Sequence, residues 1–254
     1  MATATTSVSV AREPRLLGQT VVVIGGSAGI GLETARLARS EGANVVLTGR
    51  DPKRLEQAAR DLAAKSSAAF DANDAAAVKR FFDGLPAPID HVFVAAYTRR
   101  SYGPMLESSS EEVGAGVGRR VTQVLEIARH AAPKMRPGGT LLLTGGTGRP
   151  LAREYGITAA AFSVLPPFTA ALAVELAPVR ANLIQAAFVD TALAAGYFAD
   201  DAAVEARREE LRATLPIRRV VEPADIAALA VHLMTNTAIT GATYDIDGGQ
   251  RLID

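Results

Sequence analysis

The sequence predicts a single α/β domain, built as a doubly wound parallel sheet of about seven strands. Short apolar runs rich in Val, Ile and Leu alternate with longer stretches of helical periodicity along most of the 254 residues. Continuously apolar strands that alternate with helices are typical of a parallel sheet covered on both faces and joined by right-handed crossovers. No linker is long enough to divide two domains. The expected strands are 20–24, 44–47, 68–70, 91–95, 140–143, 181–185 and 242–246.

Helices are expected between these strands, and two prolines indicate where one of them begins. Pro166 and Pro167 suit the first turn of a helix better than its interior, so that helix is expected to start near Ser163. Residues 192–216, rich in Ala, Glu and Arg, are expected to form a mobile helical flap. Residues 1–15 lack a signal-type apolar stretch and are expected to be a flexible tail before the domain at 16–254. The expected helices are 32–41, 52–65, 75–84, 111–135, 167–176 and 223–234.

Composition and charge exclude several classes of function. Lys plus Arg and Asp plus Glu both total 27, so the zero net charge gives no electrostatic case for a nucleic-acid or membrane partner. The absence of cysteine excludes disulfides, thiolate metal sites and a cysteine nucleophile. The three histidines lack metal-ligand spacing, so no metal is expected. No apolar run approaches the roughly 18 residues that span a bilayer, and we expect a cytoplasmic protein.

A glycine-rich turn follows the first predicted strand. The segment G-G-S-A-G-I-G lies between an apolar run and a helical pattern, with Gly25, Gly29 and Gly31 spaced as G-x-x-x-G-x-G. Such a turn lets backbone N–H groups and a helix N-terminus approach a pyrophosphate, as in a Rossmann-type sheet. Glycine-rich turns also occur as helix caps and hairpins, so the motif alone is a weak signal. The residues expected to bind the cofactor here are Gly25, Ser27, Ala28, Gly29, Ile30 and Gly31.

The end of the second strand predicts which nicotinamide cofactor is preferred. This strand ends as V-V-L-T-G-R, with Gly49 where NAD enzymes place an acid for the ribose hydroxyls. Arg50 follows, and its guanidinium suits a 2′-phosphate and the face of an adenine. Ser27 offers an additional hydroxyl. The alternative is that Arg50 is a solvated residue of the turn T-G-R-D-P. We expect NADP(H).

At this point the chain resembles the short-chain dehydrogenase/reductase family over nearly all of residues 17–252. The resemblance rests on the glycine turn, F-D-A-N-D, F-V-D-T, L-A-V-E-L-A-P and the ending T-G-A-T-Y-D-I-D-G-G. It implies that Asp71 caps the adenine amine, with Ala72 beside it. It also implies that the backbone at Val189 and the hydroxyl of Thr191 hold the nicotinamide carboxamide. The resemblance further implies a homodimer or homotetramer, and it places Ala95 and Ala96 at the cofactor.

The catalytic residues of that family are replaced in this chain. The family uses a Tyr proton donor, a Lys four residues later, a Ser about thirteen residues earlier and an Asn on the fourth helix. Counting back without gaps from L-A-V-E-L-A-P puts the Tyr at Thr158, the Lys at Phe162 and the Ser at Gly145. A similar count puts the Asn at Arg120. The usual proton relay is therefore absent.

Tyr155 is the candidate for a displaced proton donor. It lies three residues before Thr158, but the residue four further on is Ala159 and not Lys. Without a cationic neighbour, a tyrosine keeps a pKa near 10, about three units above working pH. Such a tyrosine can still donate a hydrogen bond, which reduction requires. The alternative is that Tyr155 is a partly buried loop residue.

Two functions of different classes remain open at this stage. The first is an NADP(H)-dependent oxidoreductase that transfers hydride to a small carbonyl compound, imine or activated alkene through a non-standard site. Leu193, Tyr197 and Phe198 of the flap would then form an apolar wall for the small-molecule substrate. The second is an NADP(H)-binding sensor or partner subunit without turnover. An open pocket at the nicotinamide end would favour the first, and a filled one the second.

Overall fold

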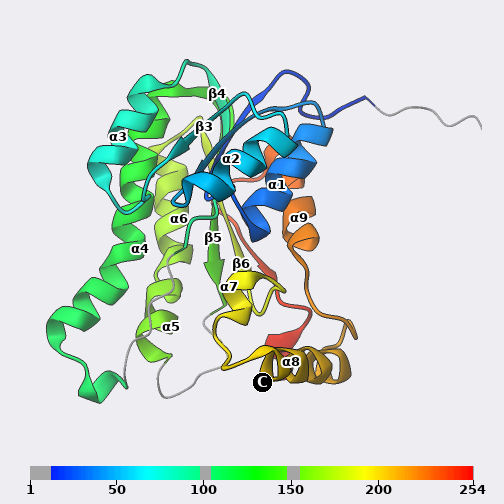
Figure 1. Ribbon diagram of the computed structural model, residues 1–254. Coiled ribbons are helices and arrows are strands. Elements are labelled where there is room, and N and C mark those ends of the chain that lie inside the picture. The colour runs from blue at the N-terminus through cyan, green and yellow to red at the C-terminus, as the bar shows by residue number, and fades with distance from the viewer. Residues whose placement is uncertain (1–12, 98–103, 148–154, 254) are drawn as a thin grey trace, which may run out of the picture.

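The computed structural model describes residues 13–97, 104–147 and 155–253, and a parallel sheet forms its centre (Figure 1). The strands are β1 (Thr20–Ile24), β2 (Asn44–Gly49), β3 (Ser66–Ala69), β4 (Ile89–Val94), β5 (Met135–Gly146), β6 (Arg180–Ala186) and β7 (Thr243–Ile246). In the described ranges all neighbouring strands pair in parallel, in the order β3-β2-β1-β4-β5-β6-β7. Because the chain winds outward from β1 in both directions, a switch point lies between β1 and β4. The predicted doubly wound sheet is confirmed.

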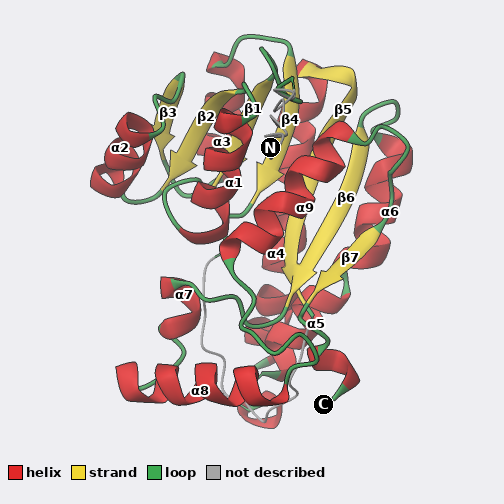
Figure 2. Ribbon diagram, turned by 90° about the vertical axis from the view of Figure 1, so that its right-hand side faces the viewer, coloured by secondary structure: helices red, strands yellow, loops and turns green. Residues whose placement is uncertain are grey.

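Helices cover both faces of this sheet (Figure 2). They are α1 (Gly29–Ser40), α2 (Pro52–Asp61), α3 (Ala75–Gly84), α4 (Ser110–Ala131), α5 (Gly156–Ser163), α6 (Leu165–Glu175), α7 (Ala192–Ala195), α8 (Asp201–Thr214) and α9 (Pro223–Thr235), with 3₁₀ turns η1 (Met105–Glu107), η2 (Ala132–Lys134) and η3 (Gln250–Leu252). Val21 and Val23 of β1 pack with α1, α2 and α9, whereas Val22 and Ile24 pack with α3 to α6. Successive side chains of a strand point to opposite faces, so one apolar strand contributes to both cores.

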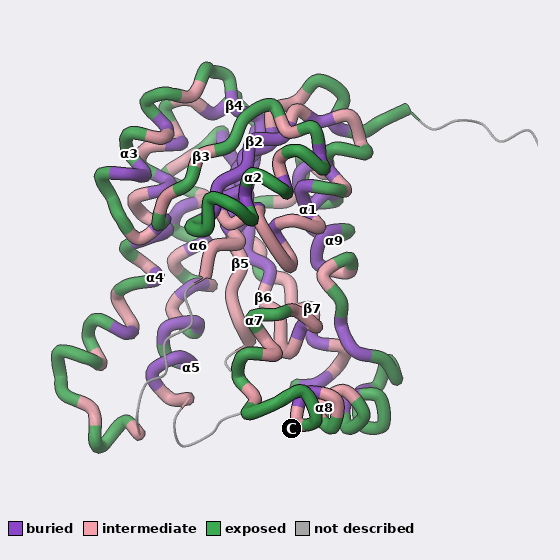
Figure 3. The backbone as a smooth tube through the Cα atoms, viewed as in Figure 1, coloured by how far each residue is buried: buried purple, intermediate pink, exposed green. Residues whose placement is uncertain are grey.

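The segment predicted as a flap contains α7 and α8, which lie beyond the carboxyl ends of the strands (Figure 2). Val204 and Leu211 of α8 are buried, and Leu211 packs with Leu215 and Phe188. Other residues of α8 are exposed (Figure 3). The segment is therefore a helical cover at the edge of the sheet where ligands bind in such folds. Its mobility stays a prediction.

Two predicted helix ends are wrong, the first helix starts at Gly29 instead of residue 32, and one helix was not expected. The fourth helix ends at Ala131, and the chain passes through η2 into β5 at Met135, so 132–135 are not α-helical. The second helix ends at Asp61, because Ala63 adopts a left-handed φ of +46°. The helix expected near Ser163 is preceded by α5, which begins at Gly156; the two prolines lie in the first turn of α6, as their geometry favours.

The expectation that no apolar run is long enough to span a bilayer is also wrong. The helical stretch Gly156–Glu175 has 20 residues and a mean hydropathy of 1.8, which suffices by length and composition. Half of this apolar stretch is buried inside the fold, where it packs against β6 and α4. Its apolar character is therefore explained by its place in the core.

The N-terminal tail predicted at 1–15 meets the domain at its last residue. Residues 1–12 lie outside the described part of the chain. The backbone N–H of Arg15 donates to Oε2 of Glu41 at 2.9 Å, and its guanidinium Nη2 lies 3.0 Å from Oε1. Leu16, which follows, is fully buried.

Candidate functional site

The glycine turn after β1 packs closely against the chain that leaves β4. Gly25 has a φ of +93°, and a Cβ added there would lie 2.7 Å from the backbone nitrogen of Ala96. A Cβ on Gly31 would lie 2.0 Å from the carbonyl oxygen of Gly25. The N–H groups of Gly25 and Gly26 donate to the carbonyl oxygen of Thr48 on β2, at 3.1 and 2.8 Å. These approaches require glycine, and they hold the turn at the switch point.

The N-terminus of α1 faces this turn without a side-chain cap. The helix begins after Ala28, whose side chain has no acceptor, and its first turn contains no acidic residue. A Cβ on Gly29 would lie 3.3 Å from Cγ2 of Thr191, so there is little space between the first residue of α1 and Thr191. Uncapped N–H groups and the helix dipole favour an anionic ligand. This arrangement fits the pyrophosphate of a dinucleotide.

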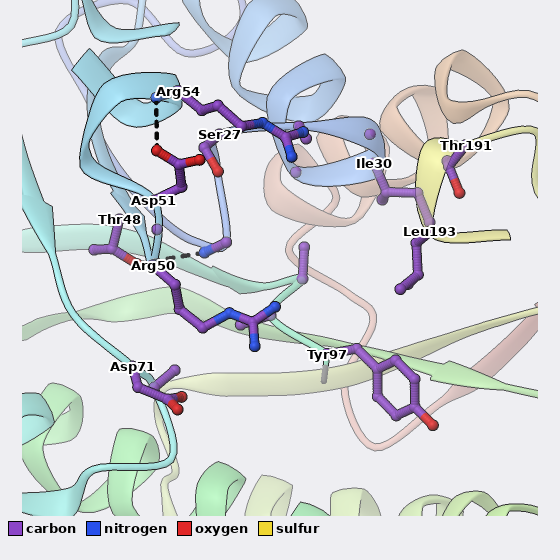
Figure 4. A pocket seen from close by; sticks show the side chains of 18 of the residues that line it. Ser27, Ile30, Thr48, Arg50, Asp51, Arg54, Asp71, Tyr97, Thr191 and Leu193 are labelled. Atoms are coloured by element: carbon purple, nitrogen blue, oxygen red, sulfur yellow. Dashed lines mark hydrogen bonds between the residues drawn. The ribbon is translucent and has the colours of Figure 1, made fainter. Parts of the chain in front are cut away.

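A cleft of about 640 Å³ extends from this turn along the carboxyl ends of the strands. It is lined by twelve of the thirteen residues predicted to bind the cofactor, namely Gly25, Ser27, Ala28, Gly29, Ile30, Gly31, Arg50, Asp71, Ala72, Ala95, Ala96 and Thr191. Val189, the thirteenth, lines a neighbouring pocket instead. In Figure 4, Arg50 extends into the cleft on the side of Asp71, while Tyr97 and Leu193 border the opposite end. The structure thus brings segments from five parts of the chain to one cleft.

The end of the cleft beside β2 is lined by basic and hydroxyl side chains. A Cβ on Gly49 would lie 2.8 Å from Oγ of Ser27, so the serine occupies the space where an acidic side chain would begin. Asp51 is committed to capping α2, because its Oδ1 accepts the N–H groups of Lys53 and Arg54 at 3.0 and 3.1 Å. The side chain of Arg54 extends toward Ser27 in Figure 4. Sequence reasoning missed Arg54; its position in the first turn of α2, four residues after Arg50, was the available signal.

Asp71 borders the same end of the cleft, after β3. Its Oδ1 accepts the backbone N–H of Asn73 at 2.9 Å and the side-chain amide at 2.8 Å. Burial acts to raise the pKa of Asp71, but the hydrogen bonds from Asn73 and the charges of Arg50 and Arg119 outweigh it and lower the pKa. Asp71 is therefore an ionised acceptor at neutral pH, which suits an exocyclic amine.

The opposite end of the cleft is formed by the segment after β6. The hydroxyl of Thr191 caps α7 by accepting the N–H of Ala194 at 3.2 Å, and it donates to the carbonyl of Val189 at 3.3 Å. Asp190 between them binds Arg208 of α8 through two hydrogen bonds of 3.0 and 2.7 Å. The flap helix is thus tied directly to the segment predicted to hold the nicotinamide.

A second pocket of about 510 Å³ adjoins this end of the cleft. The two share five lining residues: Ile30, Ala95, Tyr97, Thr191 and Leu193. Its other walls are mostly apolar and include Phe188. The three flap residues predicted to form an apolar wall, Leu193, Tyr197 and Phe198, do line this pocket. A ligand in this pocket would meet a cofactor in the cleft at the shared residues.

Of the four positions where the resemblance implies catalytic residues, three line this pocket, namely Arg120, Gly145 and Phe162. Thr158, 5% exposed, instead borders a small cavity of about 30 Å³. The ring of Phe162 packs against the backbone of Gly146, where an added Cβ would lie 2.7 Å from it, and lies 5.4 Å from the ring of Tyr97. An apolar ring therefore occupies the position where the resemblance predicts the family's lysine.

Tyr155 lies on the wall of the same pocket, at the start of α5. Burial, with a smaller contribution from the charge of Tyr197, raises the pKa of Tyr155 to about 12. It is therefore protonated throughout the neutral range and can donate a hydrogen bond. Its role as proton donor stays a prediction.

Arg120 of α4 lies between the pocket and the ends of two central strands. The residue is 6% exposed. Its Nη1 donates to the carbonyl of Ala96 at 2.7 Å and to Oε1 of Gln123, and Nη2 donates to the carbonyl of Thr144. Its Nε is buried and has no partner in the described part of the chain. Burial lowers the pKa of Arg120 to about 10, against a smaller opposing effect of Tyr97, so it is charged at neutral pH.

Comparisons with known proteins agree with this geometry. Residues 25–251 match the family described as Enoyl-(Acyl carrier protein) reductase. The short-chain dehydrogenase/reductase ATR9 of Stachybotrys chlorohalonatus is 26% identical, covering 93% of this chain and 98% of that protein. An NADP-dependent (R)-specific alcohol dehydrogenase of Lentilactobacillus kefiri is 27% identical over 92% of this chain and 97% of its own. A solved small-chain dehydrogenase in complex with NADPH has a TM-score of 0.76 and 27% identity, covering 92% of this chain and 99% of that one. The order of the strands, the glycine turn and these matches show that the chain belongs to the short-chain dehydrogenase/reductase family of oxidoreductases.

Proposed function

We propose that this protein is an NADP(H)-dependent oxidoreductase that transfers hydride to a small carbonyl compound, imine or activated alkene through a non-standard active site. The observation that carries the proposal is the open, mostly apolar pocket of about 510 Å³ that shares Ile30, Ala95, Tyr97, Thr191 and Leu193 with the cleft. A protein that only senses the cofactor needs no such space at the nicotinamide end. Pockets of this size are typical of small-molecule sites.

The proposed preference for NADP(H) is supported by the end of the cleft beside β2. Arg50 and Arg54 line it, and Oγ of Ser27 lies where an acid on Gly49 would begin. A 2′-phosphate would meet guanidinium groups and a hydroxyl, with the carboxylate of Asp51 already committed to α2.

The proton chemistry supports reduction as the favoured direction. The cofactor, when bound, supplies the hydride, and the residues of this chain position the acceptor and provide or withhold a proton. In the described part of the pocket wall, the phenol of Tyr155 has its pKa raised to about 12 and no lysine lies beside it. Alcohol oxidation needs a base at neutral pH, which a protonated tyrosine does not provide. Reduction needs only donation.

The loss of the family's Ser, Tyr, Lys and Asn favours the second candidate, a sensor or partner subunit without turnover. The two candidates are separated by titrating the protein with NADPH and NADH by fluorescence and then screening ketones, imines and enones for loss of NADPH absorbance. We expect tight NADPH binding with turnover. Tight binding without turnover on any class would favour the sensor, and absence of binding would refute both.

A variant that fills the pocket sharpens this test. Ala187 lines the second pocket and not the cleft, so Ala187→Phe should abolish turnover while NADPH binding persists. Ala213→Phe, at an exposed position of α8, is the matched control and should change neither. Turnover that survives Ala187→Phe would place the reaction elsewhere.

We also propose that the chain forms a homodimer or homotetramer. The exposed apolar side chain of Val174 on α6, 78% exposed, supports a covered surface on that helix. Light scattering of the purified protein tests this assembly, and a monomeric mass at micromolar concentration would contradict it.

A further inference from the structure

Arg120 brings an unbalanced positive charge to the substrate pocket. Its three hydrogen-bond acceptors, the carbonyls of Ala96 and Thr144 and the amide of Gln123, are all neutral. Among the described residues no carboxylate forms an ion pair with it. Buried charges in proteins are normally paired, because removing an ion from water is costly. A buried cation held only by neutral groups is what a site for a negatively charged ligand atom requires.

The other charged side chain on the described pocket wall does not change this balance. Arg207 of α8 lines the pocket, but its Nη1 lies 2.8 Å from Oε2 of Glu210. No carboxylate lies among the described residues of that wall, and the phenol of Tyr155, with its pKa raised to about 12, is neutral near pH 7. Arg120 therefore sets the sign of the charge that a substrate experiences.

The positive charge of Arg120 favours some of the substrate classes that the proposed function leaves open and disfavours others. A protonated imine carries a positive charge, which the guanidinium repels. A carbonyl compound becomes negative at oxygen when a carbon accepts hydride, and the guanidinium attracts that charge. The pocket thus favours acceptors that bear a carbonyl oxygen.

Proton supply then separates simple carbonyls from conjugated ones. A simple carbonyl becomes an alkoxide, a strong base that must take a proton at oxygen. Arg120 remains charged and gives none, so the donor would have to be the phenol of Tyr155, which its raised pKa makes a weak acid. In an α,β-unsaturated carbonyl, a C–H bond forms at the β-carbon with the electron pair of the C–H bond that breaks in the reduced nicotinamide, and the cofactor is left oxidised. The π electrons of the C=C bond form a new double bond between the α-carbon and the carbonyl carbon, and the π electrons of the C=O bond move onto the oxygen. The α-carbon then takes a proton from water and the C=O bond reforms, so the acceptor gains one hydride and one proton overall.

We propose that Arg120 binds the carbonyl oxygen of a conjugated carbonyl acceptor and stabilises the negative charge that this oxygen gains. This inference rests on the proposed reductase function and assigns a chemical role to the position where the family carries a neutral amide. The guanidinium acts on charge alone, so the missing tyrosine–lysine pair is not required for this substrate class.

The test uses 4-nitrophenol, a mimic of the enolate whose ionised form is yellow, and needs no turnover. Its visible absorbance is titrated against pH in the presence of the protein, with and without NADP⁺. We expect the pKa of the bound phenol to fall by about one to three units, as beside an opposite charge. Arg120→Met should abolish the shift and Arg120→Lys should retain part of it. Arg129→Met, which removes an exposed arginine from the same helix, should leave it unchanged.

The outcomes separate this inference from the proposed function. Binding of the neutral phenol, no binding, or an equal shift in Arg120→Met would overturn the role of Arg120. Retained NADPH binding shows that each variant is folded, and the titration of the wild-type protein is informative without any variant. Failure of NADPH to bind would refute the proposed function, while the titration without cofactor would still test Arg120.

Discussion

Replacing Gly25 by alanine tests the geometry of the cofactor turn more directly than any other single change. An added Cβ would lie 2.7 Å from the nitrogen and 2.8 Å from the Cα of Ala96, at a φ of +93°. The backbone strain costs roughly 1–3 kcal/mol, and the overpacking against rigid backbone costs roughly 1–3 kcal/mol more. Gly138→Ala is the matched control, because Gly138 has a φ of +80° but no atom within 4 Å of an added Cβ.

Both variants place alanine at a positive φ, so the difference between them measures the effect of the contact with Ala96 alone. Gly25→Ala should be less stable than Gly138→Ala by about 1–3 kcal/mol, or about 2–12 °C in Tm for a chain of this size. Urea and thermal unfolding measure the difference. NADPH affinity should fall in Gly25→Ala and stay unchanged in Gly138→Ala, since Gly138 lies near the amino end of β5, away from the cleft. Equal stability together with equal NADPH affinity in the two variants would refute the close approach of the turn to Ala96.

Three further predictions concern the cleft, the pocket and the flap. Arg50→Gln should weaken NADPH binding by about 1.5–3 kcal/mol, the value of a hydrogen bond to a charged group, with NADH binding unchanged in the same fluorescence titration. The pKa of Tyr155 is raised from 10.0 to about 12, chiefly by burial, so the neutral form stabilises the fold below pH 10. That contribution is lost as the pH rises through about 12, so wild-type stability should fall more steeply than that of Tyr155→Phe in alkaline urea unfolding. Arg208→Gln removes the two bonds to Asp190 and should speed hydrogen exchange in α8 a few-fold and raise the substrate KM.

Each of these predictions has a matched control. Arg60→Gln on α2 removes an exposed arginine paired with Glu56 and should spare NADPH binding; an equal loss of NADH binding in Arg50→Gln would contradict a phosphate role. Below pH 10 the stabilities of the wild type and Tyr155→Phe should change in parallel, which is the control, and identical profiles up to about pH 12 would contradict the raised pKa of Tyr155. Arg212→Gln breaks a bond to Glu205 but leaves the Asp190 pair, so its exchange should match wild type near Asp190. Unchanged exchange in Arg208→Gln would show that the pair does not hold the flap.

Local sequence patterns predicted the part of the site that local conformation builds. The turn from Gly25 to Gly31 requires small residues at fixed spacing between a strand and a helix. The cofactor residues that sequence reasoning named lie in the segments that follow β1, β2, β3, β4 and β6. Parallel strands bring their carboxyl ends together at one edge of the sheet.

The same reasoning could not predict what lies around the reacting atoms. Arg120 was predicted to stand at the family's Asn position, but two of its three neutral partners lie 24 residues away on either side, after β4 and near the end of β5. Whether a carboxylate would accompany it depends on how α4 packs against the sheet. The start of α5 at Gly156 was missed for a related reason, because this helix is apolar on all sides and shows little periodicity.

The sequence by itself therefore determined the doubly wound sheet and the glycine turn, because these depend on residue type and on spacing along the chain. Only the tertiary structure decided that the end of the cleft beside Thr191 opens into an apolar pocket and that Arg120 is buried there with neutral partners. Pocket shape and charge balance arise from contacts between segments distant in sequence, such as α4, β5 and α7, and no local pattern encodes them.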